Sequence, residues 1–378
     1  MAGHFSYPML SSLIDAIQQN CVLSDARDNG IYSMCTLFLR LRNLYKWEHG
    51  KLPWQEEEPA ILMEWIEQKE KLWLGLLDAP FLRLPVGEET ADPDDIELVN
   101  AFLARQNTGL LYGAGHGRSL KSIFFLAEIK ETRRLATHPV QVLDREHCRE
   151  LSSPFAMHQD GVIYFRLDPF RYFLWDKIQE AAGAKAMATR YALAKYGLID
   201  SGGKIINEKL RHHFEKIVLA EMEAILFHEL GELSPSPLSG QVLAELINAF
   251  PDSPVELIAR ATKDILADTA DGGMLQHIIE EEKFSSLGFY AAMLDGMRRE
   301  LFCEFKSAFE DFIAREDWQV IDRVRKSSYL KNLARAELLS SFSARLTETP
   351  AAQLIQEIEQ EVLFPLGLTS PQQGTNNE

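Results

Sequence analysis

The sequence lacks an apolar run long enough to cross a membrane. No stretch approaches the roughly 18 uncharged apolar residues that a spanning helix requires. The first twenty residues also lack a basic segment followed by an apolar one, which is the pattern of a secretory signal. We therefore expect neither a membrane anchor nor a signal peptide.

Basic residues are in deficit. The 378 residues include 39 Lys and Arg against 56 Asp and Glu, which gives a formal net charge of −17. Contacts to the phosphates of nucleic acids need clustered Lys and Arg, and anionic lipid surfaces attract polybasic segments. The charge balance therefore argues against nucleic-acid and membrane partners.

Cysteine is scarce and scattered. Cys21, Cys35, Cys148 and Cys303 are far apart and form no CxxC pair. This usage is typical of reduced structural thiols in a cytoplasmic protein. A nucleophile built on Cys148 lacks any family signature around it, and no Gly-x-Ser-x-Gly elbow is present.

Apolar periodicity divides the chain into four regions. Residues 1–107 show helical spacing, residues 108–168 contain short β-branched and aromatic runs, and residues 169–365 return to helical spacing. The polar tail, residues 366–378, is expected to be disordered. The sequence thus predicts an α+β, predominantly helical protein with an N-terminal helical region, a small antiparallel β-sheet and a C-terminal helical bundle.

Three local patterns make finer predictions. The acidic segment GEETADPDD predicts a surface loop, with Asp92 capping the helix that follows. The stretch from Ser286 to Ile313 predicts one long helix. Gly109, Gly113, Gly115 and Gly117 predict a loop whose backbone N–H groups could cradle phosphate, although it matches neither nucleotide fingerprint. A nucleotide-binding module is therefore the third of three functional hypotheses.

A long helix from about Lys204 to Leu233 carries the sharpest functional signal. Its second half is apolar all round, which is typical of a buried helix. Glu221, His228 and Glu232 fall on one line of it, within an arc of about 40°. Three ionisable groups inside a protein need partners, because an unpaired buried charge is very costly.

A second helix supplies a further candidate partner. In residues 255–269, Asp268 falls within the arc set by Leu257 and Ala261, and Asp264 sits at the edge of that arc. Metal sites in helical bundles combine carboxylates and histidines from facing helices. We therefore predict a zinc or iron site whose ligands are drawn from a small set: Glu221, His228, Glu232 and Asp268.

The segment His228-Glu229-Leu230-Gly231-Glu232 resembles the zincin helix, His-Glu-x-x-His, with Glu in place of the second His. The resemblance implies that His228 is a metal ligand and that Glu229 is the general base. Glu232 occupies the position of the second ligand, and a carboxylate can bind zinc there. The function implied is a metal-dependent hydrolase acting on a small molecule or a peptide.

An inert charge network is the opposing hypothesis. Arg298 lies within an apolar stripe and could pair with Asp268, Glu221 or Glu232 without any metal. The protein would then be a non-enzymatic cytosolic interaction or regulatory protein. His277 and Glu281 have helical spacing and are interpreted as solvated or as a secondary site. The sequence indicates neither the substrate nor the oligomeric state.

Overall fold

The computed structural model describes residues 7–159, 161–180 and 184–368. The chain divides into two compact units, Met1–Gln179 and Glu180–Glu378. None of the described helices is both long and apolar enough to cross a membrane. Most of the expected disordered tail, residues 369–378, lies outside the described residues.

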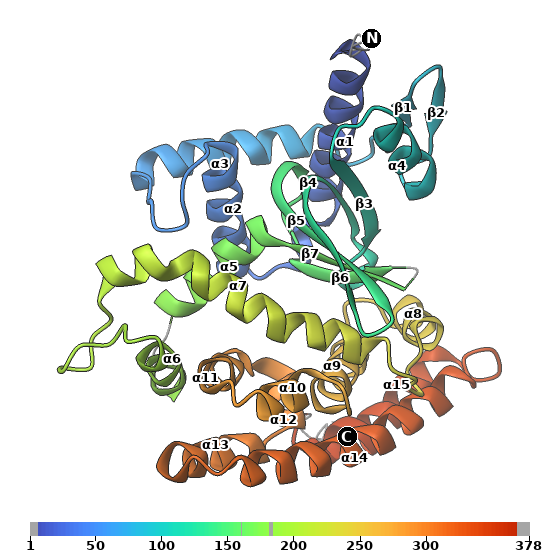
Figure 1. The fold of residues 1–378 in the computed structure, drawn as a ribbon. Coiled ribbons are helices and arrows are strands. Elements are labelled where there is room, and N and C mark those ends of the chain that lie inside the picture. The colour runs from blue at the N-terminus through green and yellow to red at the C-terminus, as the bar shows by residue number, and fades with distance from the viewer. Residues whose placement is uncertain (1–6, 160, 181–183, 369–378) are drawn as a thin grey trace, which may run out of the picture. The chain divides into compact units, whose positions relative to one another are not determined.

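The first unit combines helices with two sheets (Figure 1). Its helices are α1 (Tyr7–Asp28), α2 (Met34–Glu48), α3 (Pro59–Leu74), α4 (Ile96–Arg105) and α5 (Leu167–Gln179), with 3₁₀ turns at Asn29–Ile31 and Arg118–Leu120. Its strands are β1 (Leu84–Val86), β2 (Glu89–Ala91), β3 (Leu110–His116), β4 (Ser122–Leu135), β5 (His138–Arg149), β6 (Ala156–Gln159) and β7 (Val162–Arg166).

The larger sheet has five strands in the order β3-β4-β5-β7-β6. Every pairing is antiparallel except that of β5 with β7, which run parallel from Val140 opposite Ile163 to Leu143 opposite Arg166. The short strand β6 forms the edge of the sheet, next to β7. The chain passes through this edge position before β7 pairs with β5, and β7 therefore runs parallel to β5. The α+β, predominantly helical fold class is confirmed, and the sheet contains this one parallel pair.

The centre of the glycine-rich segment, with Gly113 and Gly115, is strand β3, so the expectation of a loop there was wrong. In β3, Gly113 lies opposite Phe125 of β4. A Cβ atom at Gly113 would lie 2.1 Å from Cζ of Phe125, because the aromatic ring covers the glycine backbone. Glycine permits this close approach within a strand. The glycine thus serves sheet packing.

Helix α1 packs against one face of this sheet. Leu13, Ile17 and Cys21 are fully buried with Tyr112 of β3 and Phe124 of β4. An ion pair reinforces the packing, because Nζ of Lys121 lies 3.0 Å from Oδ1 of Asp25 and both side chains are buried. A buried charge is tolerated when it is paired in this way.

The acidic segment before α4 also differs from expectation. Part of it, Glu89–Ala91, is strand β2, which pairs with β1 in a short antiparallel hairpin. The cap of α4 is Asp95 and not Asp92, because the Asp95 side chain accepts a hydrogen bond from the N–H of Leu98 at 3.1 Å. The cap therefore lies three residues after the expected one.

The second unit is helical. Its helices are α6 (Ala184–Lys195), α7 (Asn207–Glu232), α8 (Gly240–Ala249), α9 (Pro254–Thr269), α10 (Met274–Glu280), α11 (Phe284–Met293), α12 (Gly296–Leu301), α13 (Glu304–Arg315), α14 (Trp318–Ser343) and α15 (Ala351–Ile358). A π turn (Glu359–Leu363) and a 3₁₀ turn (Phe364–Leu366) follow α15. Helix α9 packs against α7, α8, α10, α12 and α14.

The expected long helix from Ser286 to Ile313 is broken into α11, α12 and α13. The first break follows Leu294, whose backbone is extended, and Gly296 has a φ of +53°. Glycine takes this left-handed conformation without the strain that other residues incur. The break places Arg298 on a short helix of its own.

Helices α7 and α9 meet through backbone atoms. A Cβ atom at Gly231 of α7 would lie only 2.2 Å from the carbonyl oxygen of Ala267 in α9. Only a glycine allows two helices to approach so closely at this point. Because Gly231 lies between His228 and Glu232, and Ala267 precedes Asp268, this contact brings the candidate residues together.

Candidate metal centre

His228 and Asp268 form the centre of the site. Nδ1 of His228 lies 2.7 Å from Oδ1 of Asp268, within hydrogen-bond distance. The Asp268 side chain is fully buried, and that of His228 is 15% exposed. Both residues lie on inward faces of their helices, as the sequence predicted. The packing of α7 on α9 therefore brings them together.

Asp268 also binds two groups from the broken helix region. The Tyr290 hydroxyl donates to Oδ2 of Asp268 at 3.1 Å, and Nη2 of Arg298 donates to the same oxygen at 2.6 Å. Arg298 is thus the cationic partner that the network hypothesis expected for Asp268. A buried carboxylate with three donors is fully compensated.

The other nitrogen of His228 faces Glu232. Nε2 of His228 lies 3.5 Å from Oε1 of Glu232, and the second Glu232 oxygen lies 2.7 Å from Nζ of Lys263. Asp264 completes a group in which one ligand atom each of His228, Glu232 and Asp264 lie within 4.8 Å of one another. Nε of Arg298 approaches Asp264 only to 4.0 Å.

The electrostatics of the group follow from burial and opposite charges. Burial alone would lower the pKa of His228, but the charge and hydrogen bond of Asp268, with Glu232, raise it well above its usual value. The pKa of Asp268 is lowered although burial opposes this, because Arg298 and His228 stabilise the carboxylate. Burial raises the pKa of Asp264 to about 6 despite Arg298. Without a metal, a protonated His228 therefore balances the surrounding charge.

Several features of this geometry fit a metal ion. A histidine ligand commonly donates its other N–H to a carboxylate, and here Asp268 accepts it. In a tetrahedral site with bonds near 2.1 Å, neighbouring ligand atoms lie about 3.4 Å apart. The 3.5 Å between His228 Nε2 and Glu232 Oε1 matches that spacing. His228, Glu232 and Asp264 would be ligands, and Asp268 would orient His228.

Two cationic side chains oppose the binding of a metal ion at this group. Lys263 already pairs with Glu232, and Arg298 lies near Asp264. A divalent ion would have to compete with these charges for the two carboxylates. Each carboxylate has two oxygens, and in Glu232 the oxygen facing His228 is not the one that Lys263 contacts.

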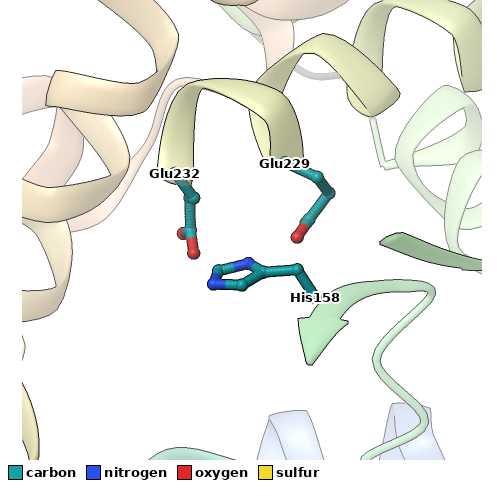
Figure 2. A group of neighbouring side chains, drawn as sticks. All are labelled: His158, Glu229 and Glu232. Atoms are coloured by element: carbon teal, nitrogen blue, oxygen red, sulfur yellow. The ribbon is translucent and has the colours of Figure 1, made fainter. Parts of the chain in front are cut away.

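Glu229 lies on the same turn of α7 as Glu232. Figure 2 shows the two side chains projecting from the same side of the helix, and a carboxylate oxygen of Glu229 lies within 4.8 Å of one of Glu232. Glu229 is 6% exposed. His158, also labelled in that figure, belongs to the first unit.

Glu221 is not among the residues that the α7–α9 contact brings together. The Tyr196 hydroxyl donates to its Oε1 at 2.8 Å. Burial raises the pKa of Glu221 to about 7, although hydrogen bonds from Tyr196 and Ser286 oppose the shift. Two turns of helix separate it from His228, so it forms a second buried polar site on the same helix.

Sequence reasoning missed two contributors to the site. Lys263 precedes Asp264 on α9, and its charge offers no signal that it pairs with Glu232. Tyr290 lies beside the apolar stripe of α11, where a tyrosine looks like an ordinary core residue. His277 and Glu281 were interpreted as solvated or as a secondary site. Glu281 is exposed, whereas His277 is half-buried and stacks on Phe227 with ring centroids 3.7 Å apart, because α10 packs against α7.

Comparison with known families supports the division into two parts. A model described as the N-terminal domain of a family of unknown function, DUF6866, matches residues 12–166. The model of the C-terminal domain of the same family matches residues 171–361, just over half of the 378 residues. The chain belongs to the DUF6866 family. The candidate site lies wholly within the C-terminal DUF6866 domain. No curated protein and no solved structure matches the chain.

Proposed function

We propose that the second unit binds one divalent metal ion, zinc or iron, through His228, Glu232 and Asp264. One observation carries the proposal: His228 is held at Nδ1 by the buried carboxylate of Asp268, while Nε2 lies 3.5 Å from Glu232. With a metal bound in place of the proton on Nε2, that arrangement would orient a neutral imidazole toward a pair of carboxylates. Three protein ligands leave a coordination position for water or a substrate, as in catalytic zinc sites.

The chemistry that such a centre supports best is hydrolysis of a small molecule or a peptide. A bound metal ion would supply Lewis acidity and lower the pKa of a coordinated water. The Glu229 carboxylate, which has an oxygen within 4.8 Å of one of Glu232, would be the base that accepts the proton of that water. A cytoplasmic location agrees with the four free cysteines.

Two ion pairs favour a second candidate function. Lys263 with Glu232 at 2.7 Å and Arg298 with Asp268 at 2.6 Å already compensate two of the carboxylates. In this alternative the group is a structural network of a non-enzymatic interaction or regulatory protein. Buried ionic networks can fix how helices pack without adding net stability.

Metal titration distinguishes the two. Chelator-treated protein should take up one equivalent of zinc or ferrous iron, measured by calorimetry and confirmed by elemental analysis after dialysis. The variants His228→Ala and Asp264→Asn should lose this uptake. The control His212→Ala, at an exposed position of the same helix, should keep it. Uptake of neither metal would sink the proposal and leave the network.

Glu229→Gln tests the hydrolytic part. This variant should bind the metal like the wild type, since Glu229 is not among the proposed ligands. It should lose about 10²-fold or more of any metal-dependent hydrolysis of chromogenic esters or peptides, which is the typical contribution of a general base. Unchanged hydrolysis by a metal-loaded Glu229→Gln variant would assign the base elsewhere.

A further inference from the structure

A cavity of about 280 Å³ opens between α6, α11, α12 and α13. Three phenylalanines form its apolar wall: Phe302, Phe305 and Phe309. Each is no more than 3% exposed, so their positions are set by the core. None of the proposed metal ligands lines this cavity. It is therefore a separate site of the same unit.

The cavity stays open because small residues line its opposite side. Helices α6 and α11 pack closely at Gly288, where a Cβ atom would lie 2.9 Å from the Cβ of Ala192. Beyond this contact, Ala188 and Ala291 offer only methyl groups to the cavity. Met187 and Leu294 complete the apolar lining, and the two alanines leave the space between them open.

The aromatic wall is preorganised. The Phe305 ring stacks on that of Phe309 at 6.2 Å and 10°, and Tyr290 meets Phe305 edge-on at 4.9 Å. Tyr290 is in turn fixed by its hydrogen bond to Asp268. Since a ligand need not order these rings, less of its binding energy is lost on entry.

Charged side chains line the rest of the cavity. Arg299, Lys306 and Glu310 are all exposed residues of its lining. Arg299 pairs with Glu300 at 3.1 Å. Among the described residues, Lys306 has no hydrogen-bond or ion-pair partner. Lys306 is therefore the cation of this lining that has no carboxylate partner, in a chain of formal net charge −17.

We propose that this cavity binds a monocarboxylic acid with an apolar body of about a dozen carbons. The size follows from volume, because a dry cavity of about 150 Å³ holds benzene and this one is about twice as large. The head group follows from Arg299 and Lys306, since guanidinium and ammonium groups bind carboxylates by charge-assisted hydrogen bonds. The apolar body lies against the three phenylalanines.

Calorimetry of the full chain with dodecanoate, below its micelle concentration, tests the proposal. One equivalent should bind, and dodecyltrimethylammonium, with the same chain and a cationic head, should bind at least ten-fold more weakly. Affinity should rise from octanoate to dodecanoate and then stop rising at hexadecanoate, because the cavity is full. No saturable dodecanoate binding, or equal binding of the ammonium compound, would overturn the proposal.

Variants locate the site. Ala291→Phe fills the cavity and should abolish binding in a protein whose circular dichroism is unchanged. Lys306→Glu should weaken dodecanoate binding about five- to ten-fold and Glu310→Lys should strengthen it, in line with the roughly 1 kcal/mol of an exposed charge pair. Arg323→Glu, the same charge change at an exposed position of α14 outside the cavity lining, should alter affinity less than two-fold. If Lys306→Glu and Arg323→Glu act alike, the carboxylate does not lie at this cavity. Should Ala291→Phe not fold, the chain-length series decides.

Discussion

Nδ1 of His228 and Oδ1 of Asp268 lie 2.7 Å apart although 40 residues separate them in the chain. The pair joins α7 to α9 and leaves only one imidazole nitrogen for any other ligand. Asp268 also binds Tyr290 and Arg298, so the orientation of His228 depends on three helices.

Asp268→Asn should weaken zinc binding without removing a ligand. The amide cannot hold the imidazole as the carboxylate does, and loss of such a partner typically costs about 10- to 100-fold in metal affinity. Urea denaturation should show that the free energy of unfolding falls by about 2–3 kcal/mol. This is less than the about 3–5 kcal/mol of a fully buried pair, because the Arg298 side chain is 28% exposed. Tyr290→Phe, which removes one neutral donor, should cost about 1 kcal/mol. Equal costs for the two variants would contradict the central role of Asp268.

Lys263→Met should separate the metal site from the inert network. Without zinc the variant should be about 1 kcal/mol less stable, because Glu232 loses a cation at 2.7 Å. Its zinc affinity should rise about five-fold, since the ion no longer competes with Lys263. Thermal unfolding with and without zinc measures both effects, and Lys209→Met at an exposed position of α7 is the control. A destabilised variant that zinc does not restore would favour the network.

Gly231→Ala should disrupt the contact between α7 and α9. The added Cβ would lie 2.2 Å from the Ala267 carbonyl oxygen, so a backbone must shift. Overpacking of this kind costs about 1–3 kcal/mol, and zinc uptake should fall with it. Gly240→Ala in the first turn of α8 has no atom within 4 Å of the new methyl group and should be neutral or slightly stabilising. Denaturant unfolding of both variants measures the difference. A Gly231→Ala variant as stable as the wild type would show that the helices can separate freely.

Glu221 should make stability depend on pH. Burial raises its folded pKa to about 7 from 4.5, so between these values the unfolded chain releases a proton that the folded chain keeps. The contribution of this group to stability therefore falls as pH rises from about 4.5 to 7, by about 3 kcal/mol in all. Glu221→Gln should become more stable relative to the wild type from pH 5 to pH 8, as measured by urea unfolding. Glu208→Gln, exposed at the start of α7, should show no such trend. A Glu221→Gln profile parallel to the wild type would exclude a neutral Glu221.

Periodicity in the sequence sufficed for the regular parts of the fold. The helices α7 and α9 were predicted from apolar spacing, and the same spacing placed His228 and Asp268 on inward faces. It also marked Arg298 as a partner for the buried carboxylates, and Arg298 does bind Asp268. These inferences succeeded because a helical face is determined by residues close together in the chain.

The remaining features depend on residues distant in the chain. Nothing near Gly113 shows that Phe125 will cover it, so the strand β3 resembled a loop. The parallel pairing of β5 with β7 depends on where β6 lies. Asp264, and not Glu221, lies near His228. This depends on the position of α9 against α7, which only tertiary packing sets.

Helix α9 packs against at least five other helices of its unit, and this has a consequence for hydrogen exchange. Its backbone amides can be exposed to solvent only when most of those neighbours separate, so they should exchange by global unfolding of the unit. The amides of α15 at the end of the chain need no such event. The residues on α9 are therefore held by a slowly opening segment of the second unit, whatever ligand they bind.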